Sequence, residues 1–131
     1  MATQTMWQRL PKLDDDDDVG VEKEQIVIRD GEPDLKFRGT LLASAAPAFR
    51  GQDRWREYRV YRTAADKYVF SKIGRSILES EVDKFEARYW PDSGWGFATE
   101  WKDAVTDFFR FDPVAKELYR KLGIDSEQRI D

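Results

Sequence analysis

Apolar and polar side chains alternate with a period of two between residues 35 and 90. In the segment LKFRGTLLA, Leu35, Phe37 and Leu41 fall on one side of an extended chain, and polar residues fall on the other. This is the period of a β-strand with one buried face. Four further segments have strand composition: QIVIR at 25–29, RWREYRVYRT at 54–63, KYVFSKIGRS at 67–76 and SEVDKFEARYW at 80–90. Together they predict a meander of four or five antiparallel strands.

The period of the apolar positions becomes helical after residue 98. Apolar residues at 101, 104, 105, 108 and 109 follow the spacing of an amphipathic helix, with Thr99 as the expected N-cap. A second helix is predicted between Asp112 as N-cap, Pro113 as first residue and Gly123 just past the end. A sheet with one apolar face must bury that face against another layer, and each amphipathic helix must bury its apolar side. We therefore predict a two-layer α+β fold, in which helices near 99–110 and 113–122 cover one face of the meander.

The first 24 residues differ from the rest of the chain in composition. Asp14 to Asp18 form a run of five carboxylates, which repel one another and contribute nothing to a core. We therefore predict a flexible acidic arm over residues 1–24, followed by a single domain over residues 25–131. Within the arm, Trp7 is an apolar residue suited to docking on a partner.

The net charge of −4 conceals a strong asymmetry along the chain. Residues 1–34 carry four positive and ten negative side chains, which gives −6. Residues 35–75 carry ten positive and three negative side chains, which gives +7, and residues 76–131 carry eight and thirteen, which gives −5. The central block is therefore the basic region of the chain, and it favours an acidic partner.

The chain contains no His and no Cys. This composition excludes disulfides, thiolate metal sites, and the Ser–His and Cys–His nucleophile pairs. The sequence has neither a P-loop nor a G-x-G-x-x-G motif, and packing of Trp95 explains the glycines of GWG at 94–96 better than phosphate binding does. We expect a non-enzymatic protein without a cofactor. No apolar run is long enough to span a bilayer, so we also expect a soluble cytoplasmic protein without membrane contact.

Carboxylates are the one group left that could support acid–base or metal chemistry. Glu79, Glu81 and Asp83 alternate at the entry of a predicted strand, a spacing that a divalent cation tolerates. A charged and solvated strand end explains the same residues more simply. A carboxylate-only, metal-dependent enzyme using these three residues is therefore kept as an alternative hypothesis.

The segment RWREYRVYRT places arginines and aromatic residues on both faces of a strand. A nucleic-acid platform would instead gather its aromatic side chains on one exposed face. Because the aromatic residues are divided between the two faces, we favour a structural strand whose arginines pair with acids such as Glu81 and Glu86. Trp and Arg are also the residue types that dominate protein-binding surfaces. The candidate partner-binding residues are Arg54, Trp55, Arg56, Arg59, Arg62 and Trp7.

The leading functional hypothesis is a small regulatory or accessory protein that acts through a protein partner, with the acidic arm as tether or competitor. The alternative is a nucleic-acid-associated protein that uses the basic block at 35–75, with the arm suppressing non-specific binding. The alternative predicts an affinity for DNA or RNA that falls steeply with salt.

The succession FRGTLLA, WREYRVYRT, KYVFSK, ESEVDKFEARYW and PVAKELYRKLGID resembles the EXLDI family of small bacterial proteins over about residues 35–131. The family takes its name from a C-terminal Glu-x-Leu-Asp-Ile motif, where this chain has EQRID at 127–131. The resemblance implies a bacterial or phage accessory protein and assigns no site residue.

Overall fold

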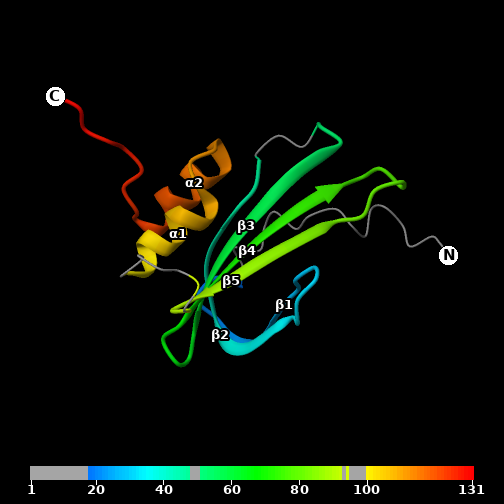
Figure 1. Cartoon of the computed structure of the whole chain (residues 1–131), viewed down its shortest axis with the longest axis horizontal. Helices are drawn as coiled ribbons and strands as arrows, with labels where there is room; N and C mark the ends of the chain where they lie inside the picture. The colour runs from blue at the N-terminus through cyan, green and yellow to red at the C-terminus, as the bar shows by residue number, and fades with distance from the viewer. Residues whose placement is uncertain (1–17, 48–50, 93, 95–99) are drawn as a thin grey trace.

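Five antiparallel strands and two C-terminal helices form the protein (Figure 1). The computed structural model describes residues 18–47, 51–92, 94 and 100–131. The strands pair in chain order, β1-β2-β3-β4-β5, and α1 and α2 lie on one side of the sheet. The predicted α+β meander with two covering helices is therefore confirmed. The elements are β1 (Glu22–Val27), β2 (Leu35–Ala45), β3 (Arg54–Thr63), β4 (Tyr68–Ser76), β5 (Lys84–Trp90), α1 (Trp101–Phe109) and α2 (Pro113–Leu122).

The sheet is strongly curled, with β1 and β2 curving away from the helices (Figure 1). Beyond the end of β1, the backbone N–H of Asp30 donates to the carbonyl oxygen of Phe85 in β5 at 2.9 Å. The carboxylate of Asp30 in turn accepts from the N–H of Phe85 at 2.9 Å. The first and last strands of the meander are thus tied together. We call the side of the sheet that carries the helices the outer face and the enclosed side the inner face.

Two local features of β2 help the sheet to curl. At Gly39, β2 approaches β3 so closely that an added Cβ would collide with the carbonyl oxygen of Arg62. Further along, Leu41 pairs with Tyr61 and Ala43 pairs with Val60, so Leu42 is an extra residue in a β-bulge. A bulge bends its strand and shifts the alternation of its side chains by one position.

The outer face holds the larger apolar core. Phe109 of α1 lies with its ring centroid 4.8 Å from that of Tyr58, and it makes an edge contact with Phe70 of β4. Helices pack on a sheet because each covers the apolar face of the other. The buried members of this cluster are Ala43, Ala45, Tyr58, Val60, Phe70, Ala104, Val105, Phe108, Phe109, Ala115, Leu118 and Tyr119.

The signals predicted for the ends of α2 are confirmed. The side chain of Asp112 accepts a hydrogen bond from the N–H of Ala115 at 2.8 Å, as an N-cap does. Pro113 begins the helix, and Gly123 ends it in the left-handed region with φ of 72°. For α1, the expected cap Thr99 lies outside the described residues, and Glu100 occupies the N-cap position without a side-chain hydrogen bond.

The first strand begins earlier than the sequence suggests. Glu22 already pairs with Thr40 of β2, and its carboxylate contacts Arg38 at 2.9 Å. The expected boundary between arm and domain at residue 24 therefore falls inside β1, because backbone pairing does not require apolar side chains. Trp7 and the first four residues of the Asp14–Asp18 run lie outside the described residues. Neither helix of the described part is long and apolar enough to cross a membrane.

Candidate functional site

The predicted partner-binding residues of β3 are divided between the two faces of the sheet. Trp55 and Arg59 lie on the inner face, where they are 6% and 9% exposed. Both are therefore buried within the curled sheet, although Trp55 also borders a hollow that Arg54 and Arg56 line. By contrast, Arg54, Arg56 and Arg62 are exposed.

The exposed arginines do not form one patch. Arg54 pairs in register with Ser76, whereas Arg62 pairs with Tyr68 at the opposite end of the hairpin. Eight residues of extended chain separate the two arginines by about 25 Å. Arg62 also contacts Asp66 of its own hairpin turn at 2.6 Å. The structure therefore groups Arg54 with Arg56 and leaves Arg62 apart.

Arg54 and Arg56 border an open hollow of about 540 Å³ at the end of β3 and β4. Gly74 contributes no side chain to its floor, and Lys84 completes the rim. With Arg75, which donates to Glu57 and Asp83, the lining carries four cationic side chains and one carboxylate, Glu81. We call this hollow, bounded by Arg54, Arg56, Gly74, Lys84 and the loop at 80–82, the basic groove.

The carboxylate of the basic groove is held in place by its neighbours. Arg54 donates through Nε to Oε1 of Glu81 at 2.9 Å, and Ser76 donates through its hydroxyl to the same oxygen at 2.7 Å. These two hydrogen bonds, the arginine's first, lower the pKa of Glu81 to about 2. Glu81 is thus ionised throughout the neutral range and fixes the guanidinium of Arg54 at the rim.

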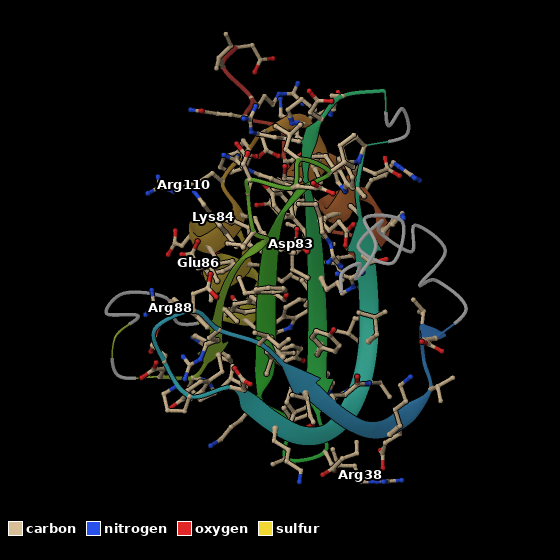
Figure 2. All side chains as sticks on the ribbon, turned by 90° about the vertical axis from the view of Figure 1, so that its right-hand side faces the viewer. Arg38, Asp83, Lys84, Glu86, Arg88 and Arg110 are labelled. Carbon is tan, nitrogen blue, oxygen red and sulfur yellow. The ribbon has the colours of Figure 1, made fainter. Side chains whose placement is uncertain are left out.

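A second hollow of about 350 Å³ extends from the basic groove along β5 and shares Arg56, Gly74 and Lys84 with it. Figure 2 shows Lys84, Glu86 and Arg88 in a row along β5. The charges alternate in this row, so the excess of positive charge is concentrated in the basic groove itself. Lys72 also lines the second hollow, and its Nζ donates to the carbonyl oxygen of Phe108 at 3.0 Å near the end of α1.

The three carboxylates considered as metal ligands do not converge. Asp83 accepts from Nη1 of Arg75 at 3.0 Å and from the backbone N–H of Ser76 at 3.3 Å, while Glu81 is bound by Arg54. Glu79 is exposed. Among the residues that the structure describes, no group of three or more His, Cys, Asp or Glu side chains is placed to hold a metal ion.

A group of charged side chains lies on the inner face, where Arg59, a predicted partner-binding residue, meets Asp83, a predicted metal ligand, through shared neighbours. Glu57, 2% exposed, accepts through Oε1 from Nη2 of Arg59 at 3.3 Å and from Nη2 of Arg75 at 3.2 Å. Its Oε2 accepts from Nε1 of Trp55 at 3.1 Å. Because Arg75 also binds Asp83, the group contains two arginines and two carboxylates. We call Glu57, Arg59, Arg75 and Asp83 the inner charge cluster.

A cavity of about 310 Å³ adjoins the inner charge cluster. Arg59, Ser71 and Arg75 form its polar wall. Ile28, 47% exposed, lies beside the opening, and Val27, Tyr61, Ile73 and Phe85 supply apolar surface. The sequence did contain a signal for this region, since Glu57 and Arg59 alternate with Trp55 and Tyr61 on one face of a strand. The partners Arg75 and Asp83 come from elsewhere in the chain, and the alternation that singled out Asp83 indicated a metal ligand and not a partner of Arg75.

Comparisons with protein-family models, with curated proteins and with solved structures return no match for this chain. The fold and the geometry of these two regions are therefore the basis for inferring function, and the resemblance to the EXLDI family stays a prediction.

Proposed function

We propose that the protein is a non-enzymatic binding protein that holds an acidic segment of a protein partner in the basic groove. The observation that supports this function is the charge of the lining, with four cations and one carboxylate around an open hollow of about 540 Å³. Val82, 77% exposed, adds an apolar contact at the same place. A segment that combines acidic and apolar side chains is complementary to both features.

The arginines of the groove differ in how firmly they are held. Arg54 is fixed by Glu81, so it would lose little side-chain entropy when a partner binds. Arg56 is 64% exposed and lies 3.6 Å from Asp112, a distance that permits only a loose ion pair. Arg56 and Lys84 are therefore the side chains best able to turn toward an incoming carboxylate.

A protein partner suits the groove better than a nucleic acid does. Single-stranded nucleic acids need exposed aromatic rings on which bases stack. Among the exposed large apolar side chains of the described residues, one is aromatic. It is Phe111, which lies between α1 and α2. Arg62 is about 25 Å from Arg54 along the strand. The positive charge is therefore local, as for a peptide, and does not extend along a track for phosphates.

The test is fluorescence anisotropy with a labelled peptide rich in Asp and Glu that also contains leucine. The double variant Arg56→Ala, Lys84→Ala should bind this peptide about tenfold more weakly, because about 1.4 kcal/mol of charge interaction is lost. The matched control is Arg62→Ala, which removes an exposed arginine from the other end of the same strand and should leave the affinity unchanged. Equal losses in both variants would refute the groove as the binding site.

Duplex and single-stranded DNA serve as competing probes in the same measurement. The proposal expects weaker binding to DNA than to the peptide at moderate salt. Tighter binding to DNA, with an affinity that falls steeply with salt and depends on Arg56 and Lys84, would favour the nucleic-acid hypothesis instead.

A further inference from the structure

The inner face changes character along its length. At one end, Val27, Val69 and Ala87 form a small apolar cluster, joined by partly buried side chains such as Phe37 and Tyr89. At the other end lies the inner charge cluster. The cavity of about 310 Å³ lies between them, so it presents arginines on one wall and apolar side chains on the others.

One hydrogen-bond donor of the inner charge cluster is not satisfied within the cluster. Nε of Arg75 is buried without a hydrogen-bond partner, whereas its two Nη atoms donate to Glu57 and Asp83. Trp55 and the backbone of Ser76 donate to the same two carboxylates. A buried donor of a charged group is costly when unsatisfied, and Arg75 is one of the side chains that line the cavity.

The charge of the cluster limits what that acceptor can be. Two arginines and two carboxylates sum to zero, so a monoanion changes the local charge by one unit only. A dianionic phosphate would place two negative charges near Glu57 and Asp83, which repel them more strongly than they repel a monoanion. A planar carboxylate also matches the geometry of a guanidinium group.

The walls and the volume define the rest of the ligand. Ile73 and Phe85 face the cavity from neighbouring strands, and Val27 lines it from β1. A volume of about 310 Å³ is at the lower end of the range for small-molecule sites. The space therefore suits one ring or a short alkyl chain.

We infer that this cavity is a binding site for a small monocarboxylic acid, with its carboxylate against Arg59 and Arg75 and its apolar body between Ile73 and Phe85. The site is distinct from the proposed function, because the two hollows share one lining residue and differ in all the others. Arg75 is the one residue that lines both hollows. It is therefore left unchanged in the tests.

The first test is isothermal titration calorimetry of the full chain with 3-phenylpropionate and octanoate. The neutral amide of 3-phenylpropionate and inorganic phosphate are the matched controls. We expect at least one acid to bind, and the amide and phosphate to bind at least tenfold more weakly. Absence of binding by both acids, or equal affinity for 3-phenylpropionate and its amide, would overturn the inference.

The second test places a carboxylate at the mouth of the cavity. Ile28→Glu changes an exposed residue, so it should fold normally, and its charge should weaken binding of the acid about tenfold. The control is Val82→Glu, the same kind of substitution in the basic groove, which should leave acid binding unchanged. If Val82→Glu weakens acid binding as much as Ile28→Glu, the acid does not occupy the inner cavity.

The two variants also separate this inference from the proposed function. Val82→Glu should weaken binding of the acidic peptide, and Ile28→Glu should not. Each site can therefore fail its own test without affecting the other.

Discussion

The two faces of the sheet are closed in different ways. Twelve buried residues form the apolar cluster on the outer face, under α1 and α2, whereas three form that of the inner face among the described residues. Separate helices can shift on a sheet until their side chains fill the space. A sheet that curls on itself has its strand spacing set by backbone hydrogen bonds, so it cannot collapse onto a gap. The outer face is therefore a packed core, and the inner face keeps a cavity and charged side chains.

Deleting a large side chain from each face should show this difference most clearly. Phe109→Ala removes a ring that is 1% exposed and should lower the free energy of unfolding by ~3 to 5 kcal/mol. Ile73→Ala should cost only ~2 kcal/mol, because Ile73 lines an open hollow and is less tightly packed. Urea denaturation monitored by circular dichroism measures both. Equal costs would mean that the two faces are packed alike.

Breaking the inner charge cluster should be nearly as damaging as opening the outer core. Glu57→Gln leaves two arginines facing one remaining carboxylate and should lower stability by about 3 kcal/mol, since an uncompensated buried charge is costly. Arg62→Gln, at an exposed ion pair, should change it by less than about 1 kcal/mol. Chemical denaturation of both variants supplies the values, and similar small losses would show that water reaches Glu57 freely.

The start of α2 is the point where a polar residue supports the outer core. Asp112 caps the helix and also accepts from the hydroxyl of Tyr58 at 2.5 Å. Asp112→Ala should therefore cost about 2 to 3 kcal/mol, more than loss of a cap alone. In a Tyr58→Phe background the same change should cost about 1 kcal/mol, which a double-mutant cycle can measure. Additive effects would mean that the two residues are not coupled.

Alkaline pH should weaken the outer core through the same pair. Burial, and then the hydrogen bond to Asp112, raise the pKa of Tyr58 from 10 to about 12. Because the folded-state pKa lies above the unfolded value, the stabilisation is complete below pH 10 and is lost as the pH rises to about 12. Tyrosinate absorbance and circular dichroism recorded together should show Tyr58 ionising only as the chain unfolds. Ionisation of all tyrosines in a folded chain at pH 10 would contradict this expectation.

The acidic arm should contribute least to either face. Replacing Asp14 to Asp18 with Ser should leave stability nearly unchanged, because exposed charges contribute little. The variant should bind heparin more strongly at low salt, since fewer carboxylates compete for the basic groove, and the gain should vanish as salt is added. Retention on a heparin column at increasing salt tests this. A large loss of stability in the variant would show instead that these acids are structural.

Local signals in the sequence were sufficient for much of the fold. Asp112, Pro113 and Gly123 fix the ends of α2 because caps and turns act within a few residues. The alternation in LKFRGTLLA and the apolar spacing between Trp101 and Phe109 each report which side of one element is buried. Because the strands all precede the helices in the chain, a meander covered by two helices was the simplest packing to predict.

The position of each arginine was not decided locally. Alternation along β3 places Arg56 and Arg62 on one face and Trp55 and Arg59 on the other, but it could not show that the second face is buried. Burial of the second face requires β1 to reach β5, which depends on close approach at Gly39, the bulge at Leu42 and the contact between Asp30 and Phe85.

The sequence by itself determined most of the secondary structure, the ends of α2 and the basic block, because each depends on residues that are near one another in the chain. Only the tertiary structure decided which charges meet. Glu57 finds Arg75 eighteen residues away, and Asp83 joins them from the loop before β5. Such contacts depend on strand register and on the curl of the whole sheet, which are set by long-range packing.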